Sequence, residues 1–436
     1  MVEQMKPSGI DWIGDIPQSW LIGRVKNFYK ILTGFTPDTS NPEYYDDDLG
    51  YDWITIADID NAKYITETKS KISQKYLQEK HPIITPKGSL LYSFKLSVGK
   101  VAFAGKDIYT NEAIASFVED KNVSLKFLYY SSALIIENAN INIYGAKIMN
   151  QELIGNAPIV FPTLEEQRFI ADFLDKQCGK LDGIISDLEK QIETLQKYKK
   201  SLILETVAKG LNKNVPMKSS GIDWIGDIPA HWETSKIKYN IGLIGSGTTP
   251  ESGNPLYYED GKYNWIQSGD LYKTDYINST EKQLTALAIK DSPALTYYEK
   301  DFVVIAMYGA SVGNVSISKI DAYTNQACCV IKAKNNDDIR YLFYYLKAAQ
   351  DEMLLKAFGG TQPNISQIII KNLNCLKVPN VEQKSISDYL DDKCGKIDSI
   401  LKDKQEQLEK IKQHKKSLIY EYVTGKKRVK EATNGN

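Results

Sequence analysis

The sequence predicts an α+β protein in which two mixed, β-rich domains are separated by two long helices that pair as an antiparallel coiled coil, with approximate two-fold symmetry. Three observations lead to this fold class. The chain is a duplication, each copy starts with short apolar runs broken by turn residues, and each copy ends in a long segment with a heptad pattern. With 436 residues, the chain is long enough for several buried cores.

The duplication is clearest in the segment SGIDWIGDIPQSW at 8–20, which recurs as SGIDWIGDIPAHW at 220–232 with 11 of 13 positions identical. Shorter matches continue through both copies, and their slowly drifting offset indicates a few small loop insertions within a full-length repeat. They pair Tyr51–Ile54 with Tyr263–Ile266, Ser97–Val101 with Ser311–Val315, Cys178–Asp182 with Cys394–Asp398, and Lys199–Ile203 with Lys415–Ile419. The repeat predicts four parts: a mixed domain at 1–162, a spacer helix at 163–214, a second mixed domain at 215–380, and a C-terminal spacer helix with its tail at 381–436.

The first part of each copy has the pattern of short strands with a few helices. Apolar and aromatic runs at Asp52–Ile56, Ser89–Phe94 and Val101–Ala104 are separated by turn signals rich in proline, glycine and aspartate. The segments Leu125–Glu137 and Ile339–Lys356, which correspond to each other in the repeat, have a helical pattern.

The second part of each copy predicts one long helix. In the first copy Thr163 is the expected N-cap, with Glu166 at the capping-box position. Apolar residues then recur at spacings of three and four, with lysines as polar interruptions at 199 in the first helix and at 404 and 415 in the second. The apolar positions are Leu181, Ile185, Leu188, Ile192, Leu195 and Leu202, and then Ile397, Leu401, Leu408, Ile411 and Leu418.

Each of these apolar stripes needs a partner, and the other stripe is the simplest one. Antiparallel pairing would bring the C-terminus back towards the first domain. Two separate small helical bundles are the alternative. The Glu205–Lys213 end of the first helix lacks heptad residues, so we expect it to tolerate insertions.

Composition excludes several classes of protein. Hydrophobic residues make up 42% and charged residues 25% of the chain, and no stretch approaches the roughly 20 apolar residues of a membrane span. The N-terminus is too polar for a signal peptide, so we expect a cytoplasmic protein. Five cysteines without a CxxC pair and only three histidines argue against a zinc site or a disulfide framework. We expect Cys328 and Cys329 to be a buried strand pair, and His81, His231 and His414 to be surface residues.

The net charge and its distribution along the chain do not indicate a nucleic-acid-binding protein. The net charge is −1, from 54 basic and 55 acidic residues, and no segment is a basic domain. Tyrosine is frequent, with 28 residues, which suits surfaces that bury area while still forming hydrogen bonds. Tyrosine-rich strands explain the composition equally well.

The sequence contains only incomplete versions of known catalytic motifs. An adenine methyltransferase needs an Asn/Asp-Pro-Pro-aromatic motif, but Asn41–Tyr44 and Asn254–Tyr257 have the wrong third residue and are interpreted as turns. A phosphate-binding GxxxxGK[ST] loop is absent from the sequence. The nuclease-like combination of Pro37-Asp38 with Glu67–Lys69 is broken in the second copy. The sequence therefore predicts a protein that is not an enzyme.

Small polar loops with glycines occur at matching places in both copies. Glycine lets backbone approach a ligand, and Thr, Asn, Gln and Lys side chains contact phosphates and base edges. Ordinary turns remain the other interpretation. The loops are 33–37 with 245–250, 95–100 with 308–314, and 144–151 with 359–364.

The order of segments is similar to that of one family. SGIDWIGDIPxxW begins a mixed domain, which is followed by P-x-L-E-E-Q, I-x-x-F-L-D, K-L-D and K-K-S-L-I, and this order is repeated over essentially the whole chain. It resembles the specificity subunit of type I restriction–modification systems. The resemblance implies two target-recognition domains, each reading one half of a bipartite site in double-stranded DNA, with the helices as spacers. Because the two domains differ outside their scaffold motifs, the site should be asymmetric.

The resemblance also implies partners. Two methyltransferase subunits would dock on the spacers, hold S-adenosylmethionine and methylate adenine, and motor–nuclease subunits would join for restriction. No cofactor or metal is expected in this chain. The rival functions are a two-headed scaffold that binds proteins and a degenerate adenine methyltransferase. The candidate DNA-binding residues are Thr33, Thr36, Lys95, Ser97, Lys100, Asn111, Lys147, Asn150, Gln151, Ser246, Thr248, Thr249, Ser311, Asn314, Asn325, Gln326, Thr361, Gln362 and Asn364.

Overall fold

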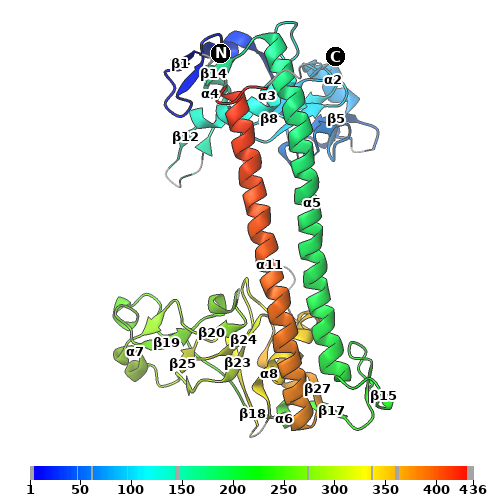
Figure 1. The fold of residues 1–436 in the computed structure, drawn as a ribbon, viewed down its shortest axis with the longest axis vertical. Helices are drawn as coiled ribbons and strands as arrows, with labels where there is room; N and C mark the ends of the chain where they lie inside the picture. The colour runs from blue at the N-terminus through cyan, green and yellow to red at the C-terminus, as the bar shows by residue number, and fades with distance from the viewer. Residues whose placement is uncertain are drawn as a thin grey trace. The chain divides into compact units, whose positions relative to one another are not determined.

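The fold is known from a computed structural model, which describes residues 4–46, 48–59, 62–95, 97–142, 145, 147–272, 274–334, 337–358 and 363–429. The chain divides into two compact units. Unit 1 is Met1–Leu188 together with Gln407–Asn436, and unit 2 is Glu189–Glu406. Each unit therefore contains one β-rich domain and a part of each of the two long helices, α5 (Leu164–Lys209) and α11 (Asn380–Val423) (Figure 1).

Unit 1 is built on a five-stranded sheet with the order β4-β11-β8-β9-β6. The strands of a three-stranded sheet, β10-β5-β7, alternate along the chain with those of the larger sheet, and pairs of strands complete the domain. The strands are β1 (Met5–Pro7), β2 (Asp15–Pro17), β3 (Leu21–Arg24), β4 (Lys30–Thr33), β5 (Tyr51–Ile54), β6 (Tyr64–Ile65), β7 (Lys71–Ile72), β8 (Leu90–Ser93), β9 (Val101–Ala104), β10 (Tyr109–Thr110), β11 (Ile114–Val118), β12 (Asn140–Ile141), β13 (Lys147–Ile148) and β14 (Pro158–Phe161). The short helices are α1 (Val25–Phe28), η1 (Pro42–Tyr44), η2 (Ile56–Asp58), α2 (Gln74–Lys80), α3 (Leu125–Ser131), η3 (Ser132–Asn138) and α4 (Gln151–Asn156).

Unit 2 repeats this plan, with a five-stranded sheet in the order β18-β26-β23-β24-β20 and a second sheet in the order β21-β19-β25-β22. The strands are β15 (Met217–Ser219), β16 (Asp227–Pro229), β17 (Glu233–Lys236), β18 (Ile241–Ser246), β19 (Tyr263–Ile266), β20 (Tyr276–Ile277), β21 (Gln283–Leu284), β22 (Tyr297–Tyr298), β23 (Phe302–Ala306), β24 (Val315–Ser318), β25 (Ala322–Thr324), β26 (Cys328–Ala333) and β27 (Asn374–Lys377). The short helices are α6 (Ile237–Asn240), η4 (Pro255–Tyr257), η5 (Ser268–Leu271), α7 (Ala286–Asp291), α8 (Ile339–Ala348), α9 (Gln350–Leu355) and α10 (Gln367–Asn372).

The predicted strands and helices are confirmed. The runs at Ser89–Phe94 and Val101–Ala104 form β8 and β9, whose inward residues are fully buried. Cys328 and Cys329 lie in the buried strand β26, and all five cysteines are free and buried. The three histidines are exposed.

The long helices pair along the predicted heptad positions within each unit. In unit 1, Asp182 on α5 accepts from Lys415 on α11, and Phe173 packs on Tyr422 with ring centroids 4.5 Å apart. In unit 2, Lys404 of α11 donates to Gln191 of α5 at 2.6 Å. A second pair there joins Lys199 to Asp398, also at 2.6 Å. As the residue numbers rise along α5, those of the contacting residues on α11 fall, so the pairing is antiparallel within each unit.

The two copies of the SGIDWIGDIP segment fix the domains to the helices by the same contact. Trp20 is fully buried, and its indole nitrogen donates to Glu166 near the start of α5 at 3.0 Å. Trp232 is equally buried and donates to Glu382 near the start of α11 at 3.1 Å. A buried indole N–H needs such an acceptor. Thr163 caps α5 as predicted, because its hydroxyl accepts from the backbone N–H of Glu166.

One expectation is wrong. The end of α5 is not free to accept inserted residues, because Thr206, Val207 and Ala208 are at most 5% exposed and Val207 and Ala208 belong to the core of unit 2. Gly210 follows with a positive φ of 70°, and a Cβ there would lie 3.2 Å from Trp232. The heptad pattern stops before this point because the helix exchanges its coiled-coil partner for the domain core.

Candidate nucleic-acid interface

The loop after the first strand of each five-stranded sheet passes directly against the strand of the neighbouring sheet. Phe35 N–H donates to the carbonyl of Thr110 at 2.9 Å, and Thr248 N–H donates to Thr324 at 3.1 Å. A Cβ on Gly34 or Gly247 would lie 2.0 Å or 1.6 Å from these same carbonyl oxygens. Glycine is required at both positions because the backbones approach so closely.

Buried aromatic residues hold this loop in the same way in both copies. The indole of Trp53 donates to the carbonyl of Phe35 at 3.0 Å, and Trp265 donates to Thr248 at 3.4 Å. One proline carbonyl in each loop accepts from a tyrosine hydroxyl, in the pairs Tyr45 with Pro37 and Tyr258 with Pro250. The loops are therefore fixed by the folded domain rather than free.

The tyrosines that hold the loops follow the Asn-Pro segments that resemble a methyltransferase motif. Asn41 and Asn254 accept from the backbone N–H groups of Glu43 and Leu256, at 3.1 and 3.2 Å, and so cap the short helices η1 and η4. This confirms their interpretation as turns.

In unit 1 the structure brings several predicted residues together on one exposed face, which we call loop face 1. Glu112 accepts from Thr36 and from Lys95, the latter at 3.3 Å. Nearby, Gln151 at the start of α4 donates to the hydroxyl of Thr33 at 2.7 Å. Loop face 1 consists of Thr33, Thr36, Lys95, Glu112 and Gln151.

Unit 2 presents a corresponding loop face 2, made of Thr249, Gln326 and Tyr308, with Ser246 and Thr248 on the same loop. Thr249 donates to Gln326, which takes the place of Glu112 in the repeat. Tyr308 takes the place of Lys95, and burial raises the pKa of its hydroxyl above the usual value. The two faces therefore have one scaffold and different chemistry.

These side chains prefer the edges of different bases. Glutamine and asparagine pair with the N6 and N7 edge of adenine, lysine favours guanine, and glutamate accepts from cytosine N4. Sequence reasoning missed Glu112 and Tyr308, because an acid and an aromatic residue are not obvious DNA ligands. Their positions opposite Gln326 and Lys95 in the repeat were the available signal.

Other candidates have structural contacts. Ser311 is 4% exposed and donates to the carbonyl of Ser268, and Asn314 donates to Leu271. Asn111 and Asn325 each accept from the backbone N–H two residues later, at 3.1 Å. These contacts shape the loops, and each uses at least one of the polar atoms with which the side chain could read a base.

The remaining candidates fall into three groups. Asn150 caps α4, and Lys147 pairs with Glu137. Lys100 and Asn364 are exposed, and Ser97 is half-buried. Thr361 and Gln362 lie outside the described residues.

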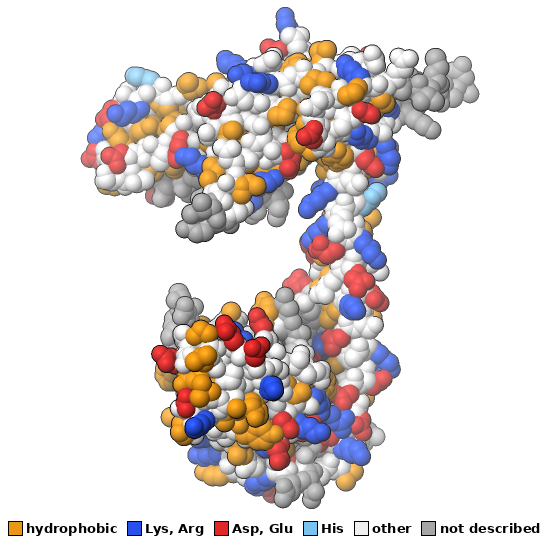
Figure 2. All heavy atoms as spheres, turned by 90° about the vertical axis from the view of Figure 1, so that its left-hand side faces the viewer, with side chains coloured by type: hydrophobic (Ala, Val, Ile, Leu, Met, Phe, Trp, Pro, Cys, Tyr) orange, Lys and Arg blue, Asp and Glu red, His pale blue; other side chains and the backbone are white. Residues whose placement is uncertain are grey.

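Charge is mixed over the surface. Figure 2 shows basic and acidic side chains interspersed over the drawn face of each unit. Among the residues that the structure describes, none of the helices is long and apolar enough to cross a membrane, and no group of three His, Cys, Asp or Glu side chains is placed to hold a metal ion.

Comparison with known proteins places the chain in a family. A family model described as "Type I restriction modification DNA specificity domain" matches residues 17–194 and again residues 229–410. This chain belongs to that family. Both copies of the repeat match, in agreement with the two units of the structure.

Individual relatives agree with this assignment. The type I restriction enzyme MjaIX specificity subunit of Methanocaldococcus jannaschii is 24% identical over 432 residues, which cover 96% of each chain. The HindI specificity subunit of Haemophilus influenzae is 32% identical over 116 residues, 27% of this chain and 25% of that protein. A solved chain from work on the complex assembly and conformational transition of the type I R-M system has a TM-score of 0.69 at 15% identity, covering 94% of this chain and 98% of that one. The last match supports the fold.

Proposed function

We propose that this chain is the DNA sequence-specificity subunit of a type I restriction–modification complex. Each recognition domain reads one half of an asymmetric bipartite site in double-stranded DNA. Loop face 1 and loop face 2 are the reading surfaces. The observation that carries the proposal is that one duplicated scaffold holds two faces of different chemistry at equivalent places, Glu112 with Lys95 in one and Gln326 with Tyr308 in the other.

The partners follow from the family. Two methyltransferase subunits dock on the paired helices, hold S-adenosylmethionine and methylate adenine, and motor–nuclease subunits join for restriction. The mixed surface charge of this chain supports a division of labour in which partner subunits supply part of the phosphate contacts, since non-specific affinity for DNA comes mainly from lysine and arginine. The complex acts in the cytoplasm, where the DNA is.

The test is to express the full chain with its methyltransferase subunit in a host that lacks other adenine methylation and to sequence the methylated positions. We expect one bipartite, asymmetric motif and a purified complex with two methyltransferase subunits per chain. Gln326→Ala should relax the motif in one half, and Glu112→Ala should relax it in the other. Glu67→Ala, at an exposed acid outside both faces, is the matched control and should leave the motif intact. Methylation without a bipartite motif would contradict the proposal.

A further inference from the structure

One position of the repeat carries opposite charges in the two copies. Lys63 precedes β6 and Asp275 precedes β20, and each backbone carbonyl accepts from the matching strand, from Phe103 N–H at 2.8 Å and from Ile317 N–H at 2.9 Å. The backbone is therefore equivalent at the two sites. Both residues lie against α5, Lys63 beside Asp175 in unit 1 and Asp275 beside Lys199 in unit 2.

In unit 1 the lysine itself bridges domain and helix. The Lys63 ammonium lies 2.6 Å from Asp175 on α5 and 5.2 Å from the centre of the Tyr129 ring. Asp175 also accepts from Tyr130. Both charged side chains are about one-third exposed. Burial alone would raise the pKa of Asp175, but the hydrogen bonds from Lys63 and Tyr130 outweigh it and hold that pKa below its usual value.

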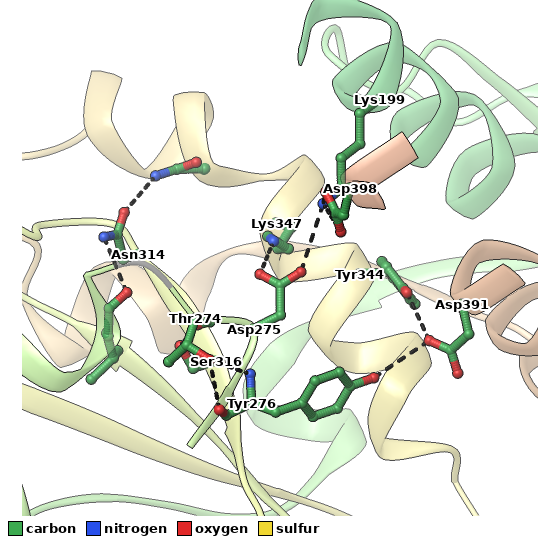
Figure 3. A network of polar contacts seen from close by, with 12 residues as sticks. Lys199, Thr274, Asp275, Tyr276, Asn314, Ser316, Tyr344, Lys347, Asp391 and Asp398 are labelled. Atoms are coloured by element: carbon green, nitrogen blue, oxygen red, sulfur yellow. Dashed lines mark hydrogen bonds and ion pairs between the residues drawn. The ribbon is translucent and has the colours of Figure 1, made fainter. Parts of the chain in front are cut away.

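In unit 2 the residue before the strand is an aspartate, and Lys347 of α8 supplies the cation (Figure 3). Asp275 accepts from Lys347 of α8 and lies 3.8 Å from Lys199 of α5, which in turn pairs with Asp398. The Lys347 ammonium lies 5.0 Å from the centre of the Phe343 ring. Phe343 is the counterpart of Tyr129 in the repeat. An ammonium therefore lies over the same ring position in both units, although it is attached to different elements.

The exchange is compensated elsewhere. Asp391 on α11 corresponds to Asp175 on α5. Asp275 carries the same charge as Asp391 and cannot neutralise it. Asp391 is instead paired with Arg340 of α8 at 2.7 Å, and it also accepts from Tyr344 at 2.7 Å. The counterpart of Lys347 in unit 1 is Ala133, which is exposed. Each unit thus places an ammonium over the ring with a different pair of residues, Lys63 with Ala133 or Asp275 with Lys347, and unit 2 also needs Arg340, the counterpart of Lys126, to neutralise Asp391.

We propose that this ammonium, which we call the junction cation, positions each recognition domain on the long helices, in unit 1 by pairing with Asp175 of α5 and in unit 2 by pairing with Asp275, which lies against Lys199 of α5. The residue that supplies it can be changed only together with the residues that compensate its charge. A cation against an aromatic face and a half-buried carboxylate is favourable, whereas an unpaired charge left at such a place is costly. Lys63 and Asp275 contact no DNA-reading residue in this account. They act on recognition through the domain that they hold.

Two buried thiols report on the two junctions separately. Cys178 on α5 and Cys394 on α11 occupy equivalent places beside the two clusters, and each is 3% exposed. Burial raises the pKa of each thiol to about 11. Because a thiol must become exposed before it can be alkylated, the labelling rate of each residue measures how often its own junction opens.

The experiment labels the full chain with N-ethylmaleimide and resolves the sites by mass spectrometry. Lys63→Asp should remove one partly exposed ion pair and place two carboxylates together, and the sum of these two effects should accelerate labelling of Cys178 roughly tenfold, while Cys394 keeps its rate. Lys63→Asp combined with Ala133→Lys and Lys126→Arg reproduces the arrangement of unit 2 and should return Cys178 to the rate of the unaltered chain. Lys87→Asp, at an exposed lysine of the same domain, is the control and should change neither rate.

The mirror experiment uses unit 2. Asp275→Lys should accelerate Cys394 alone, because the new ammonium meets Lys347 and Lys199, and adding Lys347→Ala should reverse the effect. An unchanged rate in either single variant, or a combined variant no slower than its single parent, would overturn the proposal. Equal acceleration of both thiols would mean general unfolding and would also overturn it.

A second measurement tests positioning and rests on the proposed function. In the complex with the methyltransferase subunit, Lys63→Asp should allow methylation of sites whose spacer is one base pair too long or too short, with both half-site sequences unchanged. Adding Ala133→Lys and Lys126→Arg should restore strict spacing. Strict spacing in the single variant contradicts the positioning role. If the unaltered chain directs no bipartite methylation, the proposed function fails, while the thiol labelling still decides the role of the junction cation.

Discussion

Lengthening the two helices together should lengthen the gap between the half-sites of the DNA target. The change duplicates Glu189–Leu195 in α5 and Leu401–Gln407 in α11, segments that pair through Gln191 and Lys404. Seven residues are one heptad, so the apolar positions on both sides of the insertion keep their register. Because α5 is one uninterrupted helix from Leu164 to Lys209, the insertion extends the path between the two domains.

The magnitude follows from helix geometry. Seven residues at about 1.5 Å each add about 10 Å, which corresponds to about three base pairs at a rise of about 3.4 Å. The half-site sequences should not change, because loop faces 1 and 2 are untouched. Sequencing of methylated DNA from cells that carry the variant and its methyltransferase gives the spacer directly.

A matched control inserts the heptad in α5 alone, which leaves seven residues without a partner and should abolish or weaken methylation. An active paired variant that methylates the original spacer would refute the reasoning that the helices set the distance. Insertion at the end of α5 is not a suitable test, since Val207 and Ala208 lie in the core of unit 2.

Three further results are expected. The purified chain without partner subunits should neither methylate nor cleave DNA, since it carries no complete motif for either reaction; activity in homogeneous material would contradict this. Trp20→Phe should lower the free energy of unfolding by about 1.5–3 kcal/mol in urea titrations, because Glu166 loses a charge-assisted hydrogen bond, and an unchanged midpoint would be inconsistent with that role. The ion pair of Lys63 with Asp175 should stabilise the fold above the unfolded-state pKa of about 3.9, and this stabilisation should be lost as the pH falls through the lower folded-state pKa of Asp175. The difference in the free energy of unfolding between the unaltered chain and Lys63→Met, measured by urea titration, should therefore shrink below about pH 4. A difference that does not depend on pH would argue against the ion pair.

The sequence predicted the architecture well because the repeat can be found by comparing the chain with itself and the heptads are local patterns. It marked Lys199, Lys404 and Lys415 as polar interruptions of the apolar stripe, but it could not assign their partners, which lie about 200 residues away in the chain. The structure shows that these lysines are not defects, because each is paired across the coiled coil.

The candidate interface was only partly predictable. Residue type selected Thr36, Lys95 and Gln326, which do lie on the loop faces, but it also selected Ser311, whose hydroxyl is buried against Ser268. The sequence does not tell whether a small polar residue shapes a turn or faces solvent, because that depends on where a distant backbone carbonyl lies. The exchange of charge between positions 63 and 275 was visible in the repeat, yet its meaning required the contacts with α8 and the long helices.

Exchange of one domain tests the central claim most directly, namely that two independent domains on one scaffold each read half of the DNA site. Residues 221–380 are replaced by the corresponding region of a relative with a different target, and the methylated motif is sequenced in cells that carry the chimera and the original methyltransferase. We expect one half of the motif to change to that of the relative, while the other half and the spacer stay the same. A motif in which both halves change, or neither does, would contradict it.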